Sequence, residues 1–259
     1  MLLSLLAGVS SFPAHAKVYK RVVVLAPAAV DIFEKLDAAD LIVGVTKSVK
    51  GLPHAKRVGS HIRPNLELIA ALSPDLIVIS SNRFFAPAFA KKLNADIFYY
   101  NPVTLEGIIA KIEELAGLIG REDKAYSLVR ELKNKLSSVK PLKKSPRVVY
   151  EVMEHPLIFA GKKNIVADII QKAGGTFLPD IPKKFVRFSY ERILVLKPDI
   201  YIYQVGPMNK NPTPPLKRPY LKGLKAVFLR VNELDFSRPN TRSFDNVLFL
   251  NRVFYELEE

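Results

Sequence analysis

The chain has 259 residues, 49% of them hydrophobic, no cysteine, and a formal net charge of +14. This length suffices for two domains of roughly 100 residues each, and the lack of cysteine excludes disulfides, thiolate metal sites and thiol nucleophiles. A strong positive charge suggests an anionic partner, such as nucleic acid, a membrane surface or an anionic ligand. The basic residues are scattered singly and in pairs without a nucleic-acid motif, so we expect most lysines to be solvated and no nucleic-acid partner.

Residues 1–16 differ from the rest of the chain because they contain no Lys, Arg, Asp or Glu. The short apolar run LLSLLAGVSSF is followed closely by AHA, which fits the small-x-small cleavage rule of a secretory signal. The run is shorter than the ~20 residues that a membrane-spanning helix needs. We therefore expect a signal peptide over 1–16 and a periplasmic or extracytoplasmic location for the mature protein.

Strands and helices alternate in the first part of the mature chain. Apolar runs rich in β-branched residues are typical of buried parallel strands, and their alternation with helices predicts a doubly wound sheet. We assign residues 17–103 to an N-terminal lobe. Its predicted strands are 21–26, 41–45, 76–79 and 96–100, and its predicted helices are 28–39, 66–72 and 87–93.

The alternation stops between residues 104 and 143, where no strand pattern occurs. One stripe of apolar residues at helical spacing covers 105–119, and a second covers 122–139. At 1.5 Å per residue the second helix would be about 27 Å long, enough to cross from one lobe to another. We therefore predict a linker helix region over 104–143.

A second lobe is predicted over residues 144–259. Its expected strands are 147–152, 200–203 and 226–231, and its expected helices are 164–172, a helix capped by Ser189, and 243–257. Residues 206–219 form a loop with five prolines, which is too long and irregular to be a simple connector. The sequence leaves the role of this loop open.

One sequence motif occurs in two similar copies in the chain. Residues 65–80 read NLELIAALSPDLIVIS and residues 189–204 read SYERILVLKPDIYIYQ, so that Glu67 and Glu191 occupy matching positions. Two copies of one unit imply two similar lobes with a cleft between them. The predicted fold is α/β, with two doubly wound Rossmann-like lobes joined by a single long α-helix and a ligand cleft between the lobes.

Ligands of doubly wound sheets meet the loops at the carboxyl ends of the strands. Arg83 is the leading candidate there, because arginine can bind carboxylate or catecholate oxygens in bidentate fashion, and the neighbouring Phe84 and Phe85 can cover a planar face. Packing of the aromatic side chains in the core and solvation of the arginines are the alternatives. Further candidates in similar loops are Arg63, Tyr100, Arg187, Tyr203 and Arg238.

The histidines do not form a metal-binding pattern. His54, His61 and His155, the last beside Glu154, are neither close in sequence nor at the spacing of a helical ligand pair. We therefore expect no protein metal site. Direct metal-ion binding stays an alternative that requires His61, His155 and a carboxylate to meet at one point.

The ordered set RVVVLAPAAVDIFEKLDAADLIVGVT, VGSHIRPNLELIAALSPDLIVIS, a long helix, AGG and SYERILVLKPDIYIY covers nearly all of residues 20–257. This set resembles the periplasmic substrate-binding proteins of ABC importers for ferric siderophores, haem and vitamin B12. The resemblance implies that Glu67 and Glu191 dock onto arginines of a membrane permease; complementing the helix dipole is the alternative role for a carboxylate in a first turn. The chain departs from the family at Gly59-Ser60, where Gly-Gly is frequent, and in having no tryptophan.

These features predict a solute-binding protein and not an enzyme, because the chain has no phosphate-binding or nucleophile-elbow motif. Among the cargoes of the resembling family we favour a ferric siderophore, since arginines and positive charge suit an anionic iron complex. Haem and cobalamin are the alternatives, followed by a direct metal-ion binder or an enzyme. We expect no resident cofactor, a permease as partner, and a monomer.

Overall fold

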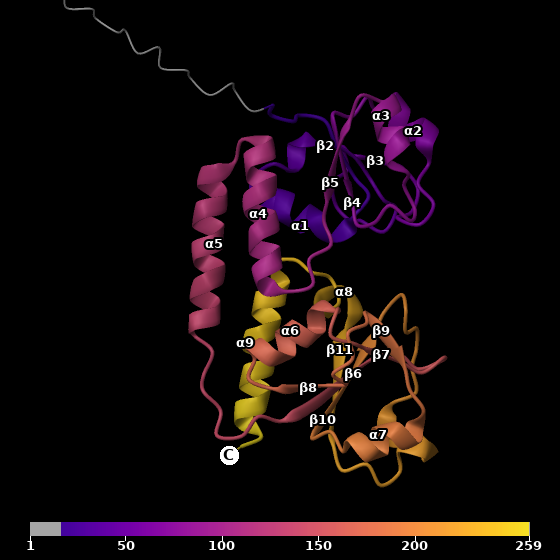
Figure 1. Ribbon diagram of the computed structural model, residues 1–259, viewed down its shortest axis with the longest axis vertical. Coiled ribbons are helices and arrows are strands. Elements are labelled where there is room, and N and C mark those ends of the chain that lie inside the picture. Colours follow the sequence, from indigo (N-terminus) through magenta and orange to yellow (C-terminus); the bar gives the residue numbers. More distant parts are fainter. Residues whose placement is uncertain (1–16, 259) are drawn as a thin grey trace, which may run out of the picture.

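The computed structural model describes residues 17–258, and the predicted signal peptide lies outside them. The first half of the chain forms one lobe and the second half another, and two long helices run along one side (Figure 1). Each lobe is built on its own β-sheet. The arrangement confirms the predicted two-lobed α/β fold.

The N-terminal lobe contains a five-stranded, fully parallel sheet in the order β3-β2-β1-β4-β5. Val22 and Val24 of the central strand pack on one face against α1 and the linker, whereas Val23 packs on the other face against α2 and α3. All three are fully buried, which explains the uninterrupted apolar run of this strand. The strands are β1 (Val22–Val24), β2 (Ile42–Val45), β3 (Lys56–Arg57), β4 (Leu76–Ile79) and β5 (Asp96–Tyr99), and the helices are α1 (Val30–Lys35), α2 (Leu66–Ala71) and α3 (Pro87–Lys92).

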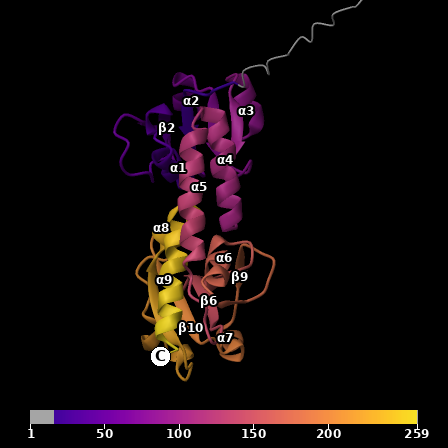
Figure 2. The ribbon, with the colours of Figure 1, turned by 90° about the vertical axis from the view of Figure 1, so that its left-hand side faces the viewer.

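The linker consists of α4 (Leu105–Ile119) and α5 (Glu122–Ser137). The Thr104 side chain caps α4 by accepting a hydrogen bond from the Gly107 N–H at 3.0 Å, and Gly120 ends the helix in the left-handed conformation at φ 64°. Figure 2 shows α4 and α5 side by side beside the upper lobe, with α5 descending to α9 of the lower lobe. There Lys135 forms an ion pair of 2.8 Å with Asp245, so α5 ties the two lobes together.

The C-terminal lobe contains a six-stranded sheet in the order β11-β10-β6-β7-β9, with β8 paired to β6. Strand β7 runs antiparallel to both of its neighbours, β6 and β9, which the sequence analysis did not foresee. Strands β7, β8 and β9 are each only three residues long. The strands are β6 (Arg147–Met153), β7 (Ile158–Ala160), β8 (Thr176–Leu178), β9 (Phe185–Arg187), β10 (Ile200–Val205) and β11 (Val227–Asn232). The helices are α6 (Ile165–Lys172), α7 (Tyr190–Leu196), α8 (Glu233–Phe236) and α9 (Arg242–Glu256).

The two lobes repeat one set of backbone contacts. In the first lobe the Asp75 carboxylate accepts a hydrogen bond of 2.9 Å from the Arg21 N–H, and the Asp75 N–H donates to the Arg21 carbonyl at 3.0 Å. In the second lobe Asp199 and Arg147 make the same two contacts at 2.7 and 2.8 Å. The parallel strands β1, β4 and β5 therefore correspond to β6, β10 and β11, and the repeat seen in the sequence is a structural repeat.

Candidate ligand-binding cleft

A cavity of about 280 Å³ lies between the lobes. The segments after β1 and β2 contribute Asp31 and Lys50 to its lining, and α8 with the loop that follows contributes Arg238 and Asn240. Strands β1, β2 and β11 all end towards this cavity. It therefore lies where ligands bind in doubly wound sheets, at the carboxyl ends of the strands.

A larger cavity of about 790 Å³ lies beside it, between α1, α5, α8 and α9. Its Lys135 and Asp245 side chains pair at 2.8 Å, and the Arg242–Asp235 pair, at 2.5 Å, borders both cavities. Of the eight residues predicted to contact the ligand, none lines this cavity and one, Arg238, lines the smaller cavity. The smaller cavity between the strand ends is the better candidate for the ligand site.

The loop after β4 presents a cation on an exposed aromatic ring. The guanidinium of Arg83 lies 5.3 Å from the centroid of the Phe84 ring, and Phe84 is 38% exposed. The His61 ring meets the same phenyl ring edge to face, with the centroids 6.3 Å apart. Phe85, in contrast, is 3% exposed and packs in the core of the lobe. Of the three residues predicted in this loop, Arg83 and Phe84 are therefore available to a ligand, whereas Phe85 is a core residue.

Arg238 reaches the cleft from the opposite lobe. Its side chain is half-buried and has no hydrogen-bond or ion-pair partner within residues 17–258. Burial lowers the pKa of Arg238, while Glu233 and Asp235 nearby act in the opposite direction. Burial, and after it the charge of Arg238, lowers the pKa of His61. A half-buried cation without a partner is poorly solvated and favours an anionic ligand.

The backbone turn that carries His61 and Arg63 depends on Gly59. Gly59 has φ +95°, and a Cβ at this position would lie 2.5 Å from the Arg63 carbonyl oxygen. Ser60 and Arg63 close the turn with reciprocal backbone hydrogen bonds of 3.1 and 3.2 Å. Only glycine fits the first position, whereas a side chain is accepted at the second. The Gly59-Ser60 departure from the family pattern therefore leaves the turn intact, and Arg63 is exposed on it.

The remaining candidates differ in their surroundings. Tyr100 is 1% exposed, and its hydroxyl donates a hydrogen bond of 2.7 Å to the Pro239 carbonyl of the other lobe. Tyr203, on β10, is 9% exposed and packs in the core of its lobe. Arg187 is exposed on β9, where it pairs with Ile158 in the sheet register. Both tyrosine rings thus contact protein, and no contact within the described residues joins Arg63 or Arg187 to the Arg83–Phe84 pair.

Glu67 and Glu191 are both exposed, each in the first turn of a short helix. The Asn65 side chain caps α2 by accepting a hydrogen bond of 3.0 Å from the Leu68 N–H. Ser189 occupies the N-cap position of α7 but makes no capping hydrogen bond. Its side chain hydrogen-bonds to Glu191, which lowers the pKa of that carboxyl. The predicted cap at Ser189 is therefore wrong in detail, and the serine supports the carboxylate of Glu191.

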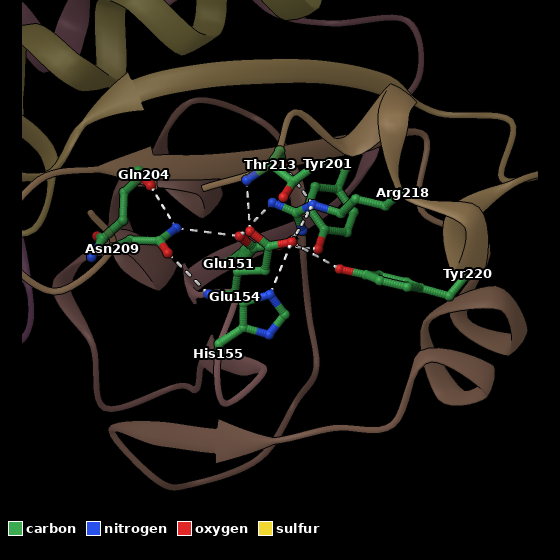
Figure 3. Close-up of polar contacts among 9 residues, drawn as sticks. All are labelled: Glu151, Glu154, His155, Tyr201, Gln204, Asn209, Thr213, Arg218 and Tyr220. Carbon is green, nitrogen blue, oxygen red and sulfur yellow. Dashed lines mark hydrogen bonds and ion pairs between the residues drawn. The ribbon is translucent and has the colours of Figure 1, made fainter. Parts of the chain in front are cut away.

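A buried charged network in the lower lobe was missed by the sequence analysis (Figure 3). Arg218, from the proline-rich loop, is 2% exposed and pairs with Glu151 of β6, which is fully buried. Its Nε lies 3.3 Å from Glu154, and Glu154 also accepts hydrogen bonds from the Thr213 N–H at 2.6 Å and the Tyr220 hydroxyl at 3.2 Å. The network holds the loop against the sheet. A glutamate inside the apolar strand RVVYEVM was the available sign of a buried partner.

Within residues 17–258, no group of three or more His, Asp or Glu side chains could hold a metal ion. His155 is 3.4 Å from Glu154 and stands apart from His61, which pairs with Phe84. The meeting of His61, His155 and a carboxylate that direct metal binding requires is not found there. In the same part of the chain, every helix is too short or too polar to span a bilayer.

Comparison with known proteins agrees with this geometry. Residues 22–181 match the family described as periplasmic binding protein. A vitamin B12-binding protein of Vibrio parahaemolyticus is 22% identical over 246 residues, which cover 88% of this chain and 87% of that protein. The high-affinity heme uptake system protein IsdE of Staphylococcus aureus is 28% identical over 195 residues, which cover 69% of this chain and 65% of that protein.

A solved structure of an ABC transporter substrate-binding protein from Listeria monocytogenes superposes with a TM-score of 0.77 at 19% identity, covering 92% of this chain and 99% of that chain. These relatives are binding proteins, which confirms the prediction that the chain is not an enzyme. The family match extends over more than half of the sequence and includes both the first lobe and the linker. The chain belongs to the periplasmic binding protein family.

Proposed function

We propose that this protein is the solute-binding component of an ABC importer, which captures a metal complex between its lobes outside the cytoplasm and delivers it to a membrane permease. The vitamin B12-binding and haem-uptake relatives support this class of cargo. Capture requires a site that both lobes share. The cavity lined by Asp31 and Lys50 from one lobe and Arg238 from the other meets that requirement.

The observation that carries the choice of cargo is the half-buried Arg238, which lines the cavity between the lobes and makes no side-chain hydrogen bond or ion pair within the described residues. A cation in this state is stabilised by an anionic ligand, and Arg83 on Phe84 adds a second cation beside an exposed aromatic face. We propose a ferric siderophore with anionic oxygen donors. Haem is the second candidate, because its propionates suit the same arginines and its ring suits Phe84, and a haem-uptake protein is among the relatives.

The delivery step assigns Glu67 and Glu191 to the permease. Both carboxylates are exposed in equivalent helices of the two lobes, and a hydrogen bond with Ser189 lowers the pKa of Glu191. We propose that a monomer docks with both helices. Export by the segment over 1–16 belongs to the same proposal.

The cargo is tested by titrating the chain from Lys17 onward with a ferric catecholate, hemin and cobalamin while following tyrosine fluorescence. We expect the ferric catecholate to bind most tightly. Replacing Arg238 or Arg83 by Ala should weaken binding at least tenfold, since a hydrogen bond to a charged group contributes about 1.5–3 kcal/mol. Arg130→Ala, at an exposed position of α5, is the control. Binding of hemin alone would replace the siderophore by haem, and binding of none of the three would refute the proposal.

A further inference from the structure

The segment that follows Asp199 has an unusual charge distribution. Residues 200–232 contain no Asp or Glu. Four lysines of this segment are exposed, and none of them forms an ion pair within the described residues; they are Lys210, Lys217, Lys222 and Lys225. A lysine-bearing surface without acidic neighbours in its own segment keeps its positive potential and attracts anionic partners.

An apolar side chain stands among these lysines. Leu216, between Pro215 and Lys217, is 83% exposed, the highest value among the large hydrophobic residues that the structure describes. Full exposure of a leucine forgoes about 1.5–3 kcal/mol of burial. A lone exposed leucine needs no explanation by itself, but here it lies at the tip of the basic segment. We call residues 206–225 the basic tip.

The basic tip cannot fold inward to bury Leu216, because its neighbours are fixed. Arg218, two residues further on, is buried and paired with Glu151 of β6 (Figure 3). Tyr220 stacks on Tyr190 of α7, with the ring centroids 3.5 Å apart. The network therefore holds Leu216 outward beside Lys217 and Lys222, as a preformed surface that loses little conformational entropy on binding.

The surface beside Leu216 is hollowed. A cavity of about 510 Å³ is lined by Leu216, Lys217, Lys222, Gly223 and Phe228, among others. Its sides are mostly apolar, and two lysines stand on it. Such a combination fits an anionic headgroup at the lysines with the adjoining apolar part of the same molecule against the leucine.

We propose that the basic tip is a membrane-contact site that binds anionic phospholipid headgroups and places Leu216 in the headgroup region of the bilayer. Lysines near an anionic membrane surface each contribute attraction, and an apolar side chain among them anchors the contact. A membrane explains the surface better than an acidic protein does, because the cations are spread along the tip and two of them, Lys217 and Lys222, border the same hollow as the exposed Leu216. Since Tyr220 stacks on Tyr190, the site lies next to α7, the helix that carries Glu191; its position beside the permease, though not its lipid binding, rests on the proposed function.

The test is co-sedimentation of the chain from Lys17 onward with vesicles of equal parts phosphatidylglycerol and phosphatidylcholine, compared with vesicles of phosphatidylcholine alone. We expect binding only to the anionic vesicles, and loss of that binding in about 0.5 M salt because exposed charges are screened. Lys217→Glu with Lys222→Glu should weaken binding at least tenfold. The matched control, Lys91→Glu with Lys92→Glu on exposed α3, changes the net charge equally and should alter binding less than twofold.

Leu216→Ser should weaken vesicle binding about threefold or more, whereas Val195→Ser, at the 76% exposed position of α7, should leave it unchanged. Circular dichroism of each variant establishes that it is folded. Equal loss in the α3 control would reduce the effect to net charge and overturn the proposal, as would the absence of vesicle binding. A different result would assign the tip to a protein partner. In that case the chain would not bind the vesicles but would bind an acidic permease surface in neutral lipid, and Lys217→Glu with Lys222→Glu would abolish that binding. The vesicles contain neither permease nor cargo, so the result is independent of the proposed function.

Discussion

Asp31 of the first lobe caps the beginning of α9 in the second lobe: its carboxylate accepts hydrogen bonds from the Thr241 N–H at 2.9 Å and the Thr241 hydroxyl at 2.8 Å. Two residues earlier, Pro239 accepts the hydrogen bond from Tyr100. The segment that joins α8 to α9 is thus held by the first lobe. The relative position of the lobes therefore depends on these contacts as well as on α5.

Asp31→Ala should lower the free energy of unfolding by about 1–2 kcal/mol, since a helix loses a charged acceptor at its N-terminus and the Thr241 hydroxyl loses its partner. Asp31→Asn keeps an acceptor and should cost less. Urea unfolding followed by circular dichroism measures both. Asp40→Ala, at an exposed position that makes no side-chain hydrogen bond or ion pair in the described part of the chain, is the control. Equal stability of the Asp31→Ala and Asp40→Ala variants would show that the capping contact contributes nothing.

The Glu151–Arg218 pair makes a second prediction about stability. Arg218→Met leaves a fully buried carboxylate without its cation, so the free energy of unfolding should fall by about 3–5 kcal/mol. Adding Glu151→Gln to that variant removes the unpaired charge and should recover part of the loss. Urea denaturation of the two single variants and the double variant gives the coupling between the residues. Additive losses would contradict a direct interaction.

His61 makes stability depend on pH in a direction opposite to that of a histidine that gains an acidic partner. Burial and Arg238 lower its pKa in the folded protein, whereas the unfolded chain has the ordinary value near ~6.5. As the pH falls, the unfolded chain therefore binds the proton first, and the free energy of unfolding decreases. Well above about pH 6.5 both states carry a neutral ring and this loss is absent.

The measurement is urea denaturation at pH 7.5 and 5.5, on either side of the ordinary histidine pKa of ~6.5. His61→Gln should lose less stability on acidification than the original chain, and His54→Gln, on the loop before β3, should behave as the original does. An anionic ligand near Arg238 would favour the protonated ring, so its affinity should rise over the same interval. If His61→Gln lost as much stability on acidification as the original chain does, the pH dependence would not come from His61 and its neighbour Arg238 would not act through it.

The repeated sequence motif predicted more of the fold than any single pattern, because it encodes the local backbone geometry of a helix end and the strand that follows. Ser73 and Lys197, at equivalent positions after α2 and α7, both have positive φ, 45° and 44°, and each is followed by the Pro-Asp pair that ties the strand start. Helix ends and buried parallel strands follow from such short-range signals. Strands β7 and β9 are too short to show a pattern, and their antiparallel pairing depends on contacts that form only in the folded lobe.

The candidate site was only partly predictable, for a related reason. Residue type and loop position pointed to Arg83 and Arg238, but they do not distinguish an exposed aromatic ring from a buried one, and Phe85 and Tyr203 proved to pack in cores. Glu151 and Arg218 meet across 67 positions of the chain. Such a pair has no characteristic spacing in the sequence, because tertiary packing alone brings the two side chains together.

Glu67 and Glu191 make the prediction that separates cargo binding from delivery. Substituting both by Ala should leave the affinity for the cargo within twofold, because neither carboxylate lines the cavity that holds Arg238. The same double variant should lose most of its stimulation of transport by a permease reconstituted in liposomes, since an exposed carboxylate bound by arginine is a charge-assisted contact.

Each helix supplies a control for this experiment. Glu67 and Glu191 contribute only weakly to their own helices, on the order of 0.3–1 kcal/mol through the dipole, so the variants should remain folded. Glu113→Ala with Glu122→Ala, at exposed positions of α4 and α5, removes the same charge elsewhere and should leave transport unchanged. If Glu67→Ala and Glu191→Ala together supported normal transport, the two carboxylates would serve only their helices; if they also abolished cargo binding, docking and capture would share one surface.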